Sequence, residues 1–168
     1  MPKIEGALEV YVGLGSNIRP AHHLREALRL LGAHFGRLRC SLVYESPPFG
    51  FSGDDFLNAV VGLQTGRPLE AIEDVLTAVE RAQGRARRSR AGSRTLDLDL
   101  LLYGMRVDPP RRLPRADVLE YPFVLAPLAE LAPALPHPVT GMPLAEAWRR
   151  MAATHPPLRR RGALAAPV

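Results

Sequence analysis

The chain contains few cysteine, lysine or aromatic residues, and it lacks any long apolar run. Cys40 is its one cysteine, which excludes an intrachain disulfide and a zinc site built from several cysteines. Because Cys40 lies in an alternating segment, we expect a buried structural thiol rather than a nucleophile. No segment approaches the roughly 20 apolar residues of a membrane-spanning helix, and the first residues show no signal-peptide pattern. We therefore expect a cytoplasmic protein that does not bind membranes.

Almost all of the positive charge comes from arginine, since Lys3 is the only lysine and the formal net charge is +5. The planar guanidinium matches phosphate and carboxylate groups, so this excess favours anionic ligands. Genome composition explains the surface arginines equally well. The length of 168 residues and the 46% of hydrophobic residues fit a globular protein with a sizeable core. We expect one domain over residues 1–155 and a loose tail over 156–168.

Hydrophobic periodicity predicts the order strand, helix, strand, strand, helix, strand. The strands are expected over 8–14, 38–45, 56–63 and 95–103, and the helices begin at Pro20 and Pro68. This is the order of a ferredoxin-like βαββαβ core, an α+β fold with a largely antiparallel sheet. Two further helices, over 122–131 and 143–153, are expected to form a C-terminal helical and loop extension packed on that core. In residues 13–17, we expect the glycines to make a turn and Ser16 or Asn17 to cap the next helix.

The segment over residues 94–104, RTLDLDLLLYG, is the most informative part of the chain. Its alternation predicts a half-buried strand, on which Asp97 and Asp99 project from the same face. Two neighbouring carboxylates repel unless a cation lies between them, and Mg²⁺ prefers such oxygen ligands together with substrate phosphates. An arginine-rich stretch from Arg85 to Arg94 leads directly into this strand. The combination predicts a nucleotide triphosphate site, whereas the acidic pair alone is also typical of a solvated strand face.

Several segments together resemble the 6-hydroxymethyl-7,8-dihydropterin pyrophosphokinase family. They occupy residues 13–17, 46–50, 56–59, 84–87, 94–99 and 122–128, in the order and spacing of that family. The resemblance covers most of the chain, and RTLDLD over 94–99 is its most specific part. It implies an ATP-dependent diphosphotransferase of folate biosynthesis with a ferredoxin-like core. Such an enzyme transfers pyrophosphate from ATP to the hydroxymethyl group of 6-hydroxymethyl-7,8-dihydropterin and releases AMP.

The resemblance also implies roles for individual residues. Asp97 and Asp99 would hold two Mg²⁺ ions and, with Arg85 and Arg94, form the catalytic set. The expected nucleotide-binding residues are Glu80, Arg85, Arg87, Arg94, Arg112 and Arg115. The expected pterin-binding residues are Ser46, Pro47, Phe49, Phe56, Asn58 and Phe123. Phe56 and Phe123 would sandwich the ring, and Asn58 can both donate and accept hydrogen bonds along its edge.

The chain departs from the family pattern at three places on the phosphate side. Ala91-Gly92-Ser93 precedes Arg94 where the family often has Trp-Gly-Pro, Arg115 stands where a histidine is common, and Tyr121 stands where an arginine is common. An inactive pterin-binding relative is therefore one alternative function. A ferredoxin-like RNA-binding module, suggested by the basic charge, is another, although the acidic pair would repel a phosphate backbone. We expect a monomer whose partners are small molecules and not nucleic acid.

Overall fold

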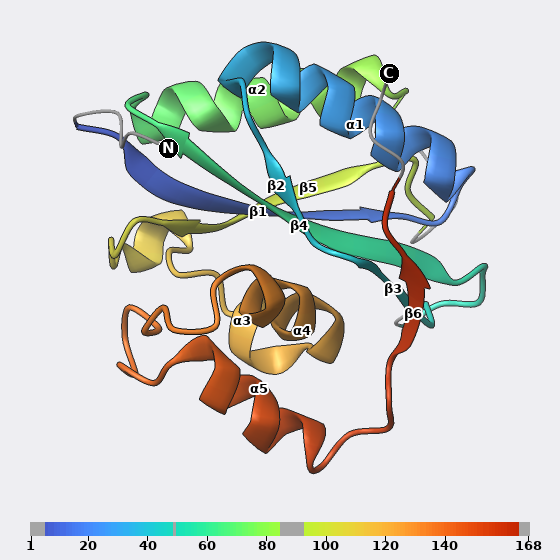
Figure 1. Ribbon diagram of the computed structural model, residues 1–168. Helices are drawn as coiled ribbons and strands as arrows, with labels where there is room; N and C mark the ends of the chain where they lie inside the picture. The colour runs from blue at the N-terminus through green and yellow to red at the C-terminus, as the bar shows by residue number, and fades with distance from the viewer. Residues whose placement is uncertain (1–5, 49, 85–92, 165–168) are drawn as a thin grey trace.

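A computed structural model describes residues 6–48, 50–84 and 93–164, in which a six-stranded sheet is covered by helices on both faces (Figure 1). The strands run in the order β5-β1-β4-β3-β6, with β2 also paired to β4, and every pairing is antiparallel. Strands β1 and β4 therefore lie at the centre of the sheet. The strand bounds are β1 (Leu8–Ser16), β2 (Arg39–Cys40), β3 (Val43–Ser46), β4 (Phe56–Thr65), β5 (Asp97–Tyr103) and β6 (Arg159–Gly162).

Two helices, α1 (Pro20–Phe35) and α2 (Leu69–Ala82), cover one face of the sheet (Figure 1). Leucines at helical spacing on α1 are buried against alternate residues of β1, which include Val10 and Val12. The residue before α1 is Arg19 in a left-handed conformation, and no side chain caps this helix. The expectation that Ser16 or Asn17 caps α1 is therefore wrong.

The opposite face carries α3 (Asp117–Glu120), α4 (Pro122–Leu131) and α5 (Leu144–Ala152), whereas η1 (Pro109–Arg111) contacts α2 through Arg111 and Glu70. A second apolar cluster joins Tyr11, Val60 and Leu101 of the sheet to Leu125 and Leu128 of α4. The C-terminal part of the chain thus packs on the sheet, as predicted. Pro127 lies inside α4 without ending it.

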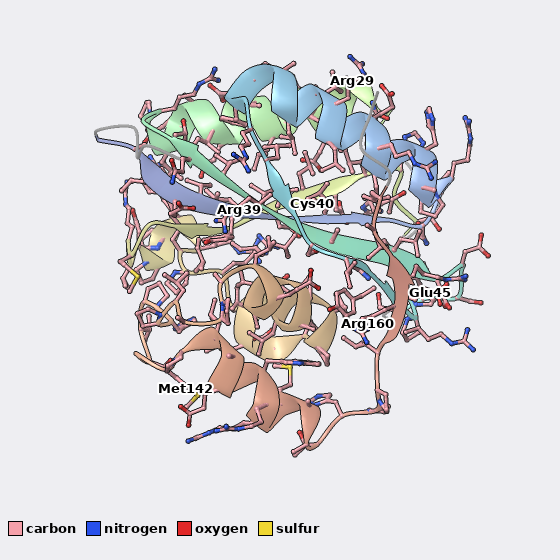
Figure 2. The ribbon with its side chains drawn as sticks, in the orientation of Figure 1. Arg29, Arg39, Cys40, Glu45, Met142 and Arg160 are labelled. Atoms are coloured by element: carbon pink, nitrogen blue, oxygen red, sulfur yellow. The ribbon has the colours of Figure 1, made fainter. Side chains whose placement is uncertain are left out.

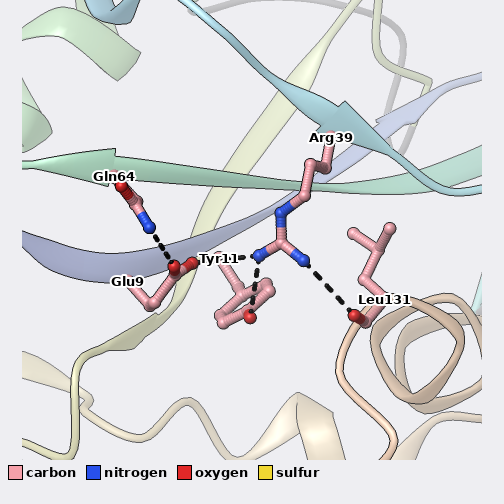
Figure 3. Close-up of polar contacts among 5 residues, drawn as sticks. All are labelled: Glu9, Tyr11, Arg39, Gln64 and Leu131. Carbon is pink, nitrogen blue, oxygen red and sulfur yellow. Dashed lines mark hydrogen bonds and ion pairs between the residues drawn. The ribbon is translucent and has the colours of Figure 1, made fainter. Parts of the chain in front are cut away.

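Polar contacts hold α4 against the sheet. Arg39 on β2 donates to Glu9 Oε2 at 2.9 Å, to the Tyr11 hydroxyl at 3.1 Å and to the Leu131 carbonyl at 3.4 Å (Figure 3). Glu130 on α4 accepts hydrogen bonds from the Leu42 N–H at 2.9 Å and from the Tyr44 hydroxyl at 2.8 Å. Burial, followed by the hydrogen bond to Glu130, raises the pKa of Tyr44 to about 12. These contacts fix the end of α4 relative to β1, β2 and β3.

The predicted strand over 38–45 is broken into β2 and β3, and Cys40 on β2 is exposed rather than buried (Figure 2). The prediction of a buried thiol is wrong because β2 has only two residues and pairs with β4 alone. Desolvation by its surroundings nonetheless raises the pKa of the Cys40 thiol to about 11. The thiol therefore stays protonated at neutral pH, which agrees with the expectation that it is no nucleophile.

The tail that we expect to be loose over 156–168 contains β6, which pairs with β3. Arg159 and Arg161 are two residues apart on this strand, and both form ion pairs with Glu45 of β3, which Figure 2 shows beside β6. The expectation is therefore wrong for Arg159–Gly162. A run of arginines indicates a solvated segment by itself, but the open edge of β3 and the Glu45 carboxylate give it a partner.

Candidate active site

A cavity of about 360 Å³ opens on the face of the sheet that carries α3 and α4. It is lined by parts of β1, β3, β4 and β5 and by residues of the segment 117–124. The structure brings eight of the predicted site residues together in it, namely Ser46, Pro47, Phe56, Asn58, Arg94, Asp97, Asp99 and Phe123. The residues predicted for the pterin and those predicted for the metal therefore share one cavity.

The register of three neighbouring strands explains this arrangement. Asp97 on β5, Gly15 on β1 and Asn58 on β4 lie in one row, and Asp99 and Gly13 are paired in the next. Neighbouring strands are about 4.8 Å apart, so the backbones of Asp97 and Asn58 are about 10 Å apart across Gly15. A Cβ atom at Gly15 would lie 3.4 Å from Asn58 Oδ1. The space between the acidic side and the amide side exists because β1 carries glycine there.

Gly13 and Gly15 lie within β1 and line the cavity. The expectation that they make a turn is therefore wrong. The sequence did not lead us to predict that these glycines form the floor of the site. Their spacing of two residues, which puts both on one face of a strand, is the signal that could have found it.

The acidic pair faces the cavity because β5 alternates. Leu98, between the two aspartates, is buried in the core beneath α1 and α2, so Asp97 and Asp99 project from the other face. Each carboxylate has an arginine nearby: Arg94 Nε lies 3.9 Å from Asp97 Oδ1, and Arg115 Nη2 lies 3.4 Å from Asp99 Oδ1. The Arg115 Nε atom also lies 3.2 Å from Asp117 Oδ2.

The donor set at this point suits Mg²⁺. Asp97 and Asp99 both direct carboxylate oxygens into one cavity, and Mg²⁺ often takes one or two carboxylates and completes its coordination with phosphates and water. Within the described part of the chain, no group of three or more His, Cys, Asp or Glu side chains is placed to hold a metal ion. The two aspartates therefore fit a metal that is bound together with a phosphate ligand rather than by the protein alone.

Asn58 is 8% exposed, and its amide nitrogen is fully engaged. Asn58 Nδ2 donates to Ser46 Oγ at 2.8 Å and to the Tyr44 carbonyl at 3.2 Å. These bonds fix the amide so that Oδ1 lies beside Gly15 in the cavity. A buried asparagine must find partners, and Asn58 finds them in Ser46 and Tyr44.

Each of the two predicted stacking rings has a second aromatic ring against it. Phe51 packs edge-to-face on Phe56, with ring centroids 6.2 Å apart, and Tyr121 stacks on Phe123 at 5.2 Å with an interplanar angle of 19°. Both supporting rings line the cavity. Phe51 was missed by sequence reasoning, and Tyr121 was noted only as a departure from the family pattern.

A second hollow of about 230 Å³ lies on the other side of the acidic pair, and Asp99 lines both. The predicted nucleotide residues Glu80, Arg112 and Arg115 line it, as does Arg111, which was not among the predicted site residues. Arg111 pairs with Glu70 at 2.7 Å. The pKa of Glu70 is lowered by a hydrogen bond from its own backbone N–H and next by Arg111.

Predicted residues that lie outside the described part of the chain are Phe49, Arg85 and Arg87, together with the altered Ala91.

Residues 11–133 match the family model of 7,8-dihydro-6-hydroxymethylpterin-pyrophosphokinase (HPPK). The chain belongs to the HPPK family. It is 38% identical over 143 residues to the 2-amino-4-hydroxy-6-hydroxymethyldihydropteridine pyrophosphokinase of Porphyromonas gingivalis, an alignment that covers 80% of this chain and 97% of that one. It is 42% identical over 137 residues to the protein of the same name from Pseudomonas aeruginosa, covering 75% and 82%. The predicted family, pyrophosphokinase class and place in folate biosynthesis are confirmed, and an RNA-binding module is not favoured.

Solved structures of HPPK-DHPS proteins share the fold. The Plasmodium falciparum HPPK-DHPS A437G structure with STZ-DHP aligns with a TM-score of 0.70 at 12% identity, covering 88% of this chain and 46% of that chain. The present chain thus spans less than half the length of that protein. The shared fold is a mixed α/β arrangement of an antiparallel sheet with helices.

Proposed function

We propose that the two hollows receive the two substrates of the HPPK reaction. The pterin lies in the cavity floored by glycine, and the phosphates of ATP extend from the acidic pair into the second hollow. The row formed by Asp97, Gly15 and Asn58 carries this proposal. It puts the Asp97 carboxylate and the buried Asn58 amide on opposite sides of Gly15, and Asp99 lies beside Gly13 in the next row.

On the pterin side, Phe56 and Phe123 offer two ring faces to a flat heterocycle. Asn58 presents Oδ1 to the polar edge of that heterocycle, and Ser46 holds the amide in this orientation. Pro47 and Phe49 complete this side of the proposed site. The hydroxymethyl oxygen would attack the β-phosphorus of ATP, forming the new O–P bond as the bond to the departing AMP breaks and the hydroxyl proton is lost. Such a transfer needs alignment and charge neutralisation rather than a covalent nucleophile.

On the phosphate side, Asp97 and Asp99 would hold two Mg²⁺ ions, which neutralise the charge of the triphosphate. Arg94 and Arg115 lie beside these carboxylates and add fixed positive charge. Glu80 and Arg112 line the second hollow, and Arg85 and Arg87 belong to the same proposed phosphate set. Arg115 carries a planar guanidinium, a shape that matches a phosphate group.

The finer architecture is also part of the proposal. The order of β5, β1, β4 and β3, with α1 and α2 on one face, supports a ferredoxin-like core. We propose a single domain that includes β6, and a cytoplasmic monomer that binds small molecules rather than nucleic acid. None of the helices in the described residues is long and apolar enough to cross a bilayer.

The test is the formation of AMP from ATP, Mg²⁺ and 6-hydroxymethyl-7,8-dihydropterin by Asp97→Asn and Asp99→Asn variants. These substitutions keep the side-chain volume and remove the charge, so turnover should fall by orders of magnitude with little change in the thermal unfolding temperature. Asp108→Asn is the matched control, since Asp108 pairs with Arg106 at 2.8 Å and lines neither hollow. Wild-type turnover and an unaltered Mg²⁺ requirement in both site variants would refute the metal assignment. Absence of AMP with the wild-type chain would favour an inactive pterin-binding relative.

A further inference from the structure

Asn17 is buried at the end of β1, and its hydrogen bonds join two segments that line the proposed site. It is 4% exposed, although it follows the last residue of a strand and lies before a helix. Its Oδ1 atom accepts a hydrogen bond from the Arg94 N–H at 2.8 Å, and its own backbone N–H donates to the Arg94 carbonyl at 3.1 Å. Asn17 therefore holds both polar backbone groups of Arg94.

The other end of the Asn17 amide holds a different segment. Nδ2 donates to the Asp54 carbonyl at 3.2 Å, and it also lies 3.5 Å from Ser93 Oγ, next to Arg94. Asp54 belongs to the stretch 50–55, which also carries Phe51, the ring that packs on Phe56 in the cavity. This stretch approaches the Arg94 segment directly, since a Cβ atom at Gly53 would lie 3.6 Å from Ser93 Oγ. One buried side chain thus connects the floor strand, the pterin side and the phosphate side.

The chemistry of the contact requires an amide. A primary amide offers an acceptor oxygen and donor hydrogens on the same short side chain. Aspartate would keep the acceptor for Arg94 and would place an anion against the Asp54 carbonyl. Alanine would leave buried backbone groups of both segments without this partner, which is costly in a desolvated position.

We propose that Asn17 is a positioning residue that sets the phosphate side and the pterin side of the site relative to β1. The inference rests on the assignment of the two sides made above. It predicts that Asn17 acts on both substrates without touching either, through Arg94 on one side and through the stretch 50–55 on the other.

The test compares Asn17→Ala and Asn17→Asp by calorimetry with 6-hydroxymethylpterin and, separately, with the Mg²⁺ complex of α,β-methylene-ATP. In Asn17→Ala, affinity for both ligands should fall roughly tenfold, the order expected for one or two lost hydrogen bonds. In Asn17→Asp, nucleotide affinity should stay within about twofold because the bond to Arg94 survives, while pterin affinity falls roughly tenfold. The second variant keeps the test decisive if the alanine variant does not fold.

Thr65→Val is the control for a merely structural role. Thr65 is buried at the far end of β4, where its Oγ1 accepts the Arg67 N–H at 3.1 Å. This variant should lose thermal stability and keep both affinities. Asn17 variants that behave in the same way would overturn the inference. Asn58→Ala and Asp97→Asn are measured alongside, because unchanged binding in those two would show that the site assignment, and not the role of Asn17, is at fault.

Discussion

Replacing Asn58 by alanine tests the pterin side of the site most directly. The substitution removes the Oδ1 acceptor from the cavity. It also removes the amide that donates hydrogen bonds to Ser46 Oγ and to the Tyr44 carbonyl. A net hydrogen bond contributes about 1 kcal/mol, and a buried polar group left unpaired costs about 1–3 kcal/mol. Pterin binding should therefore weaken by about 1–3 kcal/mol, and the free energy of unfolding should fall by about 2 kcal/mol. Nucleotide affinity should change little, because the acidic pair lies across Gly15.

Calorimetric titration of 6-hydroxymethylpterin measures the first quantity, and denaturant unfolding measures the second. Gln64→Ala is the matched control, because Gln64 lies six residues further along β4 and thus on the same face. Its amide donates to Glu9 Oε1 at 2.7 Å, away from the cavity (Figure 3). If Asn58→Ala binds the pterin as tightly as the wild type while losing stability as Gln64→Ala does, Asn58 is a structural residue and the pterin assignment fails.

Two further predictions concern the floor of the site and the response to acid. Gly15→Val should weaken pterin binding far more than Gly15→Ala, because valine methyl groups extend beyond the Cβ position 3.4 Å from Asn58 Oδ1; equal affinities in calorimetry would show that no ligand passes over β1. Burial lowers the pKa of His137, whose Nδ1 accepts the N–H groups of Val139 and Thr140 at 3.2 and 3.3 Å. In the unfolded chain His137 takes up a proton near pH 6.5, and in the folded protein it does so only at lower pH. The contribution of neutral His137 to the free energy of unfolding is therefore complete above about pH 6.5 and is lost as the pH falls through the folded pKa. His137→Asn should therefore lose less thermal stability than the wild type on acidification, and an NMR titration giving a His137 pKa at or above 6.5 would contradict this.

Much of the fold could be predicted from local patterns because each pattern carries its own spacing. The alternating apolar residues of β1 and β5 and the leucines of α1 identified these elements, and α4 begins and ends at the predicted residues. Two of the failures, the break in the strand over 38–45 and the pairing of β6, lie toward the β3 and β6 side of the sheet. Residues 41 and 42, between β2 and β3, bond to the Val60 carbonyl and to Glu130, and β6 lies beside β3 with an ion pair between Glu45 and Arg161, 116 positions away. A local pattern contains no information about such a partner.

The same limit applies to the site. Alternation alone puts Asp97 and Asp99 on one face, so their shared orientation could be predicted without any knowledge of neighbouring strands. Spacing also puts Gly13 and Gly15 on one face of a strand, but the position of Gly15 between Asp97 and Asn58 depends on the register that aligns β5, β1 and β4. Asn17 is a similar case, since its side-chain partners are 77, 76 and 37 positions away. The role of a residue that binds through its own side chain can be predicted from the sequence. The role of a residue that leaves space or holds another segment depends on the neighbours that the fold gives it.

Two departures from the family pattern compensate each other in the structure. Tyr121 removes a positive charge from a position where the family often has arginine, and its ring supports Phe123 instead. Arg115 adds a positive charge where a histidine is common, and it lies 3.4 Å from Asp99 at the boundary of the two hollows. The site therefore keeps a fixed positive charge beside the acidic pair and gains aromatic surface on the pterin side. Because charge beside the proposed phosphate site and a flat surface beside the proposed pterin site are both present, these substitutions are no argument for an inactive relative.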